Sequence, residues 1–170
     1  MSAHTPPPSI TPTPLPASAT GSTHRGSRVS VHRVRLEHLA VELLRVSGAL
    51  RLPVPVEALW QHPPQGLWDP QSENFALYPS RPGDDPYAGR WRIATAIANA
   101  VSGTAWVNKV HLMGAVPFNE ADRQVFARAL LVPTPLLSTL SERQKSPERI
   151  HNIFQVPLAE AKVRLEELGL

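Results

Sequence analysis

The sequence contains no cysteine among its 170 residues. Disulfide bonds and thiolate-bound zinc are therefore excluded, and the absence fits a reducing compartment. No apolar run approaches the roughly 20 residues that a membrane-spanning helix needs. The first residues, M-S-A-H-T-P-P-P, also lack the basic start and apolar stretch of a signal peptide. From these absences we expect a cytoplasmic protein with no membrane partner.

Acidic residues are absent from the first 36 positions, which carry four basic residues: Arg25, Arg28, Arg33 and Arg35. This segment has a net charge of +4, whereas the rest of the chain has 17 − 4 = 13 basic residues against 14 acidic ones, a net charge of −1. Because four arginines make few phosphate contacts, a solubilising tail is favoured over a nucleic-acid contact. Specific nucleic-acid binding is not expected.

The chain divides into a leader and one domain. Residues 1–27 include P-P-P-S-I-T-P-T-P-L-P followed by small polar residues. Such a segment buries too little apolar surface to offset the entropy lost on ordering, so we expect it to be disordered. Residues 34–170 are long enough to bury a single core.

The hydrophobic pattern of this domain predicts mostly helices. The first expected helix begins at Val34 and ends at Gly48, and a second one begins shortly after Pro55. Four further helices are expected at about 88–102, 119–131, 147–154 and 157–168. The segment N-F-A-L-Y, residues 74–78, is a strand candidate, and Trp68 with its neighbours is a candidate partner strand. We therefore predict an α+β fold, mostly helical, with a small β-hairpin or sheet near residues 66–79. The expected core residues are Leu39, Leu43, Leu59, Phe75, Ile93, Ile97, Val101, Phe126, Leu130 and Leu165.

The segment R-W-R-I-A-T-A-I-A-N-A-V-S-G, residues 90–103, has the rhythm of a zinc-peptidase helix. In the H-E-x-x-H motif, two histidines four residues apart on one helix face bind zinc, and the glutamate polarises the attacking water. Here Thr95 and Asn99 stand at the two histidine positions, and Ala96 stands at the glutamate position.

Three segments together resemble the ImmA/IrrE family of zinc endopeptidases. Arg90, Trp91, Ile93 and Ala94 match the start of its R-F-T-L-A-H-E-L-G-H motif. The segment F-A-R-A-L-L-V-P (126–133) is similar to the family's F-A-A-E-L-L-M-P, and residues 153–170 are similar to its closing R-L-x-x-L-G-L segment. The resemblance covers about residues 36–170 and implies a zincin-like domain.

The resemblance also implies a zinc site, formed by the two motif histidines and an acid just before F-A. That acid falls at Asp122, with Glu120 as the other candidate. Thr95 and Asn99 offer neutral oxygens, which are poor zinc ligands, and Ala96 has no group that transfers a proton. We therefore expect neither bound zinc nor catalysis, and no catalytic or metal-binding residue is assigned.

The resemblance implies a protein that acts by binding. Active relatives cleave helix-turn-helix repressors of the Xre type in stress and mobile-element switches, so such a repressor is the expected partner. The groove beside the helix Ala94–Val101 is the expected docking site.

Two alternatives remain open. One is an active metallopeptidase whose metal is held by a non-standard set of ligands, such as Asp122, Glu120 and His111. The other is a DNA-associated regulator that uses the last two helices together with the basic leader, although the final helix is net acidic and favours a packing role.

Overall fold

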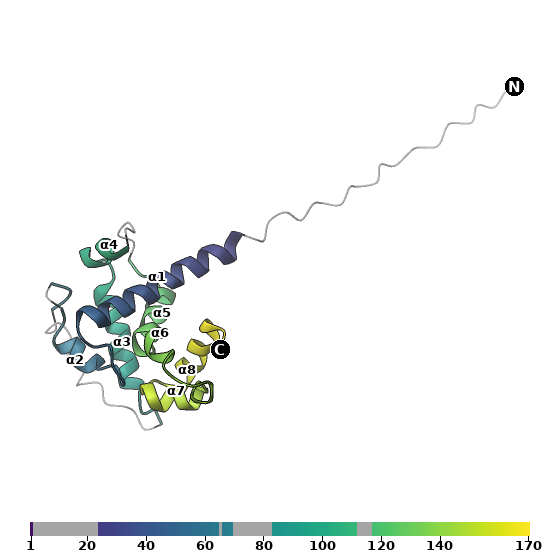
Figure 1. Ribbon diagram of the computed structural model, residues 1–170. Helices are drawn as coiled ribbons and strands as arrows, with labels where there is room; N and C mark the ends of the chain where they lie inside the picture. Colours follow the sequence, from purple (N-terminus) through teal and green to yellow (C-terminus); the bar gives the residue numbers. More distant parts are fainter. Residues whose placement is uncertain (2–23, 65, 70–82, 112–116) are drawn as a thin grey trace.

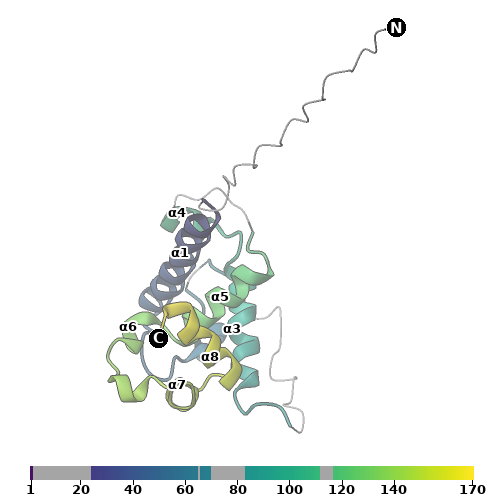
Figure 2. The same cartoon turned by 90° about the vertical axis from the view of Figure 1, so that its right-hand side faces the viewer.

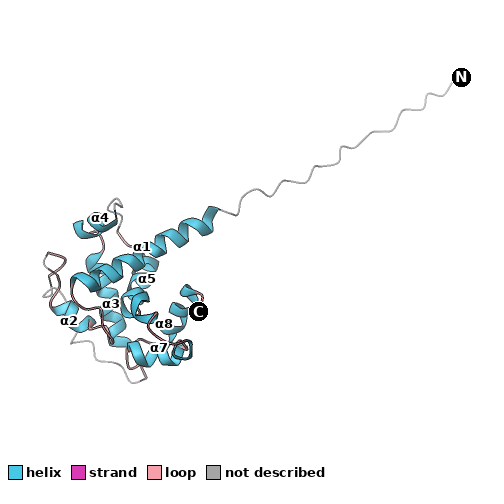
Figure 3. Cartoon of the chain, viewed as in Figure 1, coloured by secondary structure: helices cyan, strands magenta, loops and turns pink. Residues whose placement is uncertain are grey.

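The computed structural model describes Met1 and residues 24–64, 66–69, 83–111 and 117–170 (Figure 1). Within these ranges every regular element is a helix (Figure 3). The elements are α1 (His24–Val46), α2 (Val56–Gln61), α3 (Ala88–Val101), α4 (Ala105–His111), α5 (Glu120–Leu131), α6 (Thr134–Leu137), the 3-10 helix η3 (Glu142–Gln144), α7 (Pro147–Phe154) and α8 (Leu158–Leu168). None of these helices is both long and apolar enough to span a membrane.

The prediction of an α+β fold is wrong, because the described ranges contain helices and no strand. Trp68, predicted in a partner strand, stacks on Trp60 with ring centroids 6.0 Å apart. Its indole N–H donates to the Trp60 carbonyl oxygen at 3.2 Å. The segment around Trp68 thus packs by its side chain onto α2 and forms no sheet edge. The strand candidate 74–78, which includes the predicted core residue Phe75, lies outside the described residues.

Helix α5 lies at the centre of the bundle, where α1 and α3 both pack against it and α8 contacts it (Figure 2). From Phe126 to Leu131 every residue of α5 is buried. This burial is unusual for a helix, since most have only one apolar face. The burial is explained by the sequence F-A-R-A-L-L, because its small and apolar side chains allow other helices to pack on every face of this part of α5.

Helix α1 buries the stripe that its sequence predicts: Leu36, Leu39, Ala40, Leu43 and Leu44. It ends before Gly48, whose φ of 66° is the left-handed conformation that favours glycine after a helix. The helix begins at His24, however, ten residues before the expected start at Val34. Apart from Met1 and the first turn of α1, the predicted leader, residues 1–27, lies outside the described residues.

The rest of the predicted core is buried with one exception. Ile93 is only partly buried, because the face of α3 that meets the core is formed by Ala94, Ile97, Ala98 and Val101. Ile93 lies at the margin of that face and packs against the core from its edge.

Helices α7 and α8 form a tight pair joined at Gln155, which has a left-handed φ of 55°. Helix α8 packs against α7 and α5, and its buried residues are Ala161, Arg164 and Leu165. The last helix therefore has the packing role that its acidic composition predicts.

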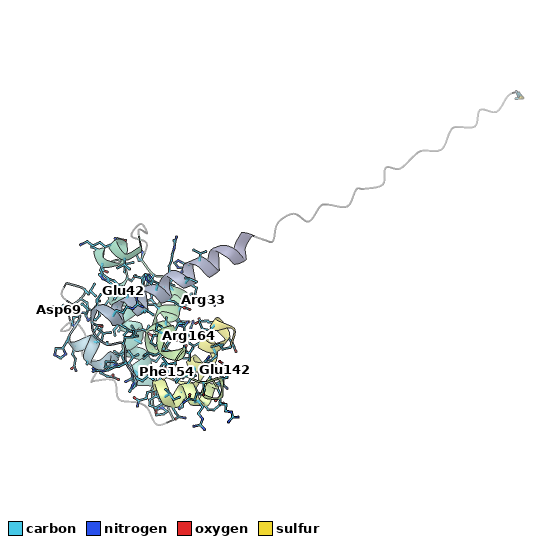
Figure 4. All side chains as sticks on the ribbon, in the orientation of Figure 1. Arg33, Glu42, Asp69, Glu142, Phe154 and Arg164 are labelled. Carbon is cyan, nitrogen blue, oxygen red and sulfur yellow. The ribbon has the colours of Figure 1, made fainter. Side chains whose placement is uncertain are left out.

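Two buried arginines join α8 to the rest of the bundle. Arg164 has no exposed surface and lies inside the helical body (Figure 4). It donates to the Glu37 carboxylate at 2.7 Å, to the Val132 carbonyl oxygen at 3.2 Å and to the Thr134 hydroxyl at 3.2 Å. One side chain of α8 thus holds α1, α6 and the end of α5 together.

Arg128 of α5 is the second buried arginine, and it pairs with Glu160 at 3.0 Å and Glu167 at 2.7 Å. Burial by itself lowers the pKa of Arg128, but the hydrogen bonds that it donates to the Glu167 and Glu160 carboxylates outweigh this effect and raise the pKa above its ordinary value. Glu167 also lies 3.6 Å from Arg164. The two arginines and their carboxylates therefore form one continuous ionic network.

Candidate functional site

The candidate site lies where α3 packs against α5, since this contact joins the zinc-motif positions to the expected third ligand. Helix α3 is started by Asp85, whose carboxylate accepts the Tyr87 N–H at 2.9 Å and whose carbonyl oxygen accepts the Ala88 N–H at 2.9 Å. The second carboxylate oxygen of Asp85 accepts the Leu158 N–H of α8 at 3.1 Å. Asp85 thus fixes the beginning of α3 against the beginning of α8.

The motif positions of α3 have structural contacts of their own. The Thr95 hydroxyl donates to the Trp91 carbonyl oxygen one turn earlier, at 3.0 Å. Ala96 is half-buried and packs against the core, and Asn99 is exposed. Thr95 and Asn99 are four residues apart on one helix, as the motif requires, but the hydroxyl is bonded within the helix.

Asp122, the expected third ligand, is the third residue of α5 and closes a capping box with Asn119. The Asn119 side chain accepts the Asp122 N–H at 2.9 Å, and the second carboxylate oxygen of Asp122 accepts the Asn119 N–H at 3.1 Å. Such reciprocal bonds satisfy two N–H groups that a helix start leaves without partners. Asp122 therefore starts α5.

The other carboxylate oxygen of Asp122 lies 2.8 Å from Nε2 of His32 on α1. The Asp122 side chain is 13% exposed and that of His32 is 43% exposed. Both oxygens of the expected ligand are therefore bonded inside the fold, one to its own helix start and one to α1.

His32 is a site residue that the sequence reasoning missed. It lies 90 positions from Asp122 in the chain and two positions before the predicted start of the first helix. A signal for it was present, because position 32 continues the spacing of Leu36, Leu39 and Leu43 by one turn. His32 thus extends the buried face of α1 with a polar side chain.

The remaining metal candidates are not brought to Asp122 by any contact that the structure describes. Glu120 is exposed and accepts hydrogen bonds from Arg123 at 2.9 Å and from Gln124 at 3.3 Å. The bond from Arg123, followed by the bond from Gln124, lowers the pKa of Glu120 below its ordinary value. His111 is the last residue of α4, and its side chain lies outside what the structure describes.

Zinc does not fit the residues of this site. The motif positions supply a hydroxyl bonded to its own helix, a methyl group and an exposed amide, where tetrahedral zinc prefers imidazole, thiolate or carboxylate. To bind a metal through one oxygen, Asp122 would have to give up its bond to Asn119 or its bond to His32. Within the described ranges, no three His, Asp or Glu side chains are grouped as a metal would need.

Arg90, the first residue of the motif-like segment, joins three parts of the fold. Its guanidinium donates to both Glu57 carboxylate oxygens at 2.9 Å, to the Gln155 carbonyl oxygen at 3.0 Å and to the Val54 carbonyl oxygen. The arginine thus ties α3 to α2 and to the turn between α7 and α8. Its place in the motif has a structural explanation that involves no metal.

The docking groove expected beside Ala94–Val101 is filled. Ala94, Ile97, Ala98 and Val101 have no exposed surface, because α5 covers this face of α3. The face of α3 that remains available to a partner is the one that carries Asn99.

No protein-family model, curated protein or solved structure matches this chain. The resemblance to ImmA/IrrE peptidases therefore depends on the sequence motifs alone.

Substitution of Asp122 by alanine tests the capping role. We expect Asp122→Ala to lower the free energy of unfolding by about 1–2 kcal/mol, because α5 loses a capping bond and His32 loses its partner. Urea unfolding followed by circular dichroism measures this change. Glu120→Ala, in the same helical turn but exposed, is the matched control and should leave the stability almost unchanged. Equal effects of the two substitutions would contradict the capping role.

Proposed function

We propose that this chain is a catalytically inactive relative of the ImmA/IrrE zinc endopeptidases, and that it acts in the cytoplasm by binding another protein. The proposal is supported above all by the hydrogen bonds of the Asp122 carboxylate. Its two carboxylate oxygens are used by the start of α5 and by His32, so the one acid left from the expected ligand set has a structural role.

The contacts of Arg90 support the same proposal. The segments that resemble the family hold the fold together through Arg90 and through the packing of α5 and α8. A chain that keeps the scaffold contacts and replaces the zinc ligands retains a surface for a partner without the means to cleave it.

The proposed partner is a helix-turn-helix repressor of the Xre type, in a stress or mobile-element switch. Active members of the resembled family cleave such repressors. An inactive relative would hold the repressor intact, and it would compete with an active protease for the same substrate.

Direct mixing of the purified full chain with purified Xre-type repressors of its native host tests this function. We expect a stable complex by isothermal titration calorimetry and an intact repressor on gels, with or without added zinc. Cleavage that a chelator stops would favour the alternative of an active metallopeptidase. Absence of a complex with every repressor tested would contradict the proposed partner.

A substitution on the outer face of α3 locates the docking surface. Asn99→Arg places a large charged side chain on the available face of α3, and we expect the affinity for the repressor to fall about tenfold or more, a loss typical of a disrupted interface residue. Asn152→Arg makes the same change at an exposed position of α7 and is the matched control. Equal affinities of the two variants would exclude this face of α3.

A further inference from the structure

In Figure 1 the first half of α1 extends away from the rest of the bundle. The helix begins at His24, and its first core residue is Leu36. The residues between them, 24–35, form a helical rod of about 18 Å at the usual rise of 1.5 Å per residue. We call this segment the α1 arm. The contact of His32 with Asp122 joins it to the start of α5.

The α1 arm carries all four basic residues of the acid-free segment: Arg25, Arg28, Arg33 and Arg35. The first acidic residue of the chain is Glu37, which follows the arm and pairs with Arg164. A disordered tail would spread four charges over a variable length, whereas the helix holds them within about 15 Å. The helical backbone therefore sets the spacing of the four arginine positions along the arm, which the sequence alone did not predict.

Three of the five described side chains of the arm are exposed, whereas Arg33 is half-buried and His32 is bonded to Asp122. Val31 is 50% exposed and Val34 is 61% exposed, and Arg35 is also exposed. No hydrogen bond or ion pair holds Arg33 or Arg35 among the residues that the structure describes, whereas Arg90, Arg128 and Arg164 are all paired.

We propose that the α1 arm binds the phosphodiester backbone of duplex nucleic acid without sequence selectivity. Beside its four arginines, the arm contains two serines and two histidines and no acidic residue, so the side chains are of the kinds that donate to phosphate oxygens. Arginine suits this partner, because its planar guanidinium donates two parallel hydrogen bonds to a phosphate. The proposal goes beyond the protein-binding function and does not depend on it.

The composition of the arm favours nucleic acid over other anionic partners. A helix that lies on a lipid surface presents large apolar side chains such as Leu, Phe or Trp, and the apolar residues of the arm are three valines. Protein interfaces are anchored most often by Trp, Tyr or Arg, and the arm has arginines but no aromatic residue besides its two histidines.

Fluorescence anisotropy of a labelled DNA duplex with the full chain tests the proposal. With four phosphate contacts, the affinity should fall about 100-fold between about 50 and 200 mM salt. The double variant Arg33→Gln, Arg35→Gln should bind about tenfold or more weakly at the lower salt concentration, and its log–log salt slope should be smaller by about 2.

The matched control is the double variant Arg143→Gln, Arg149→Gln, which removes the same charge from exposed positions of η3 and α7. It should keep the wild-type affinity within about twofold if the contact is local to the arm. Equal losses in the two variants would overturn the proposal, because diffuse net charge would then explain the binding. Binding to anionic phospholipid vesicles without binding to the duplex would also overturn it, as would a tenfold preference for one of two unrelated duplex sequences.

Discussion

Replacement of Arg164 by methionine is expected to lower the free energy of unfolding by about 3–5 kcal/mol, the range for breaking a buried ion pair from one side. The Arg164 side chain has no exposed surface, and its guanidinium bonds to the Glu37 carboxylate at 2.7 Å. Methionine fills much of the volume but leaves the Glu37 carboxylate without its positive partner in a largely buried place, and it leaves Glu167 with Arg128 alone. We expect the unfolding free energy to fall mainly because carboxylate charge is left buried, and less because the contact itself is lost.

Urea unfolding of Arg164→Met, followed by circular dichroism, measures this loss. Lys162→Met is the matched control, because position 162 is exposed on the same helix, and it should leave the stability almost unchanged. A double-mutant cycle with Glu37→Gln gives a second test: Glu37→Gln should cost less in the Arg164→Met background than in the wild type. Additive effects, or similar losses at positions 162 and 164, would contradict the ionic network.

Replacement of Arg90 by methionine has the second largest expected effect, a loss of about 2–3 kcal/mol of unfolding free energy, typical of hydrogen bonds made by a charged group. The Arg90 side chain is 13% exposed. Its removal leaves the carbonyl oxygens of Val54 and Gln155 without this donor and releases Glu57. The expected loss should be the same with and without zinc, because the role of Arg90 is structural.

The control for Arg90 is Arg92→Met, two positions along the same helix. Arg92 is 36% exposed and lies 3.5 Å from Asp84, and exposed pairs of this kind contribute about 0–1 kcal/mol. Thermal unfolding of both variants should therefore show a clearly larger fall in melting temperature for Arg90→Met. If Arg90→Met destabilises no more than Arg92→Met, the structural explanation of the motif arginine is wrong.

The sequence predicted most helices because their apolar residues recur with helical spacing. The buried stripe of α1 from Leu36 to Leu44 is the clearest case. The same argument missed the start of α1, because residues 24–31 carry arginine, serine and glycine and have no apolar stripe of their own. It also failed around Trp68, because a short apolar run does not separate strand from other structure, and Trp68 packs on Trp60 instead of forming a strand.

The candidate site was predicted only in part. The motif comparison singled out Asp122 as the expected third ligand, but it did not predict the bonds that Asp122 makes. Its capping bond with Asn119 could have been read from the spacing N-x-x-D. Its contact with His32 could not be predicted, because no local sequence pattern indicates that two residues 90 positions apart lie in contact. Likewise, no sequence pattern marked Arg164 as buried, since arginine is almost never fully buried unless it is paired.

The zinc content of the full chain tests the central claim most directly. The claim is that Asp122 serves the start of α5 and the contact with α1, and that the chain acts by binding without a metal. Elemental mass spectrometry on protein purified without chelator or affinity tag measures zinc per chain. The account predicts a value near zero. A value near one zinc per chain, lost in Asp122→Ala, would contradict it.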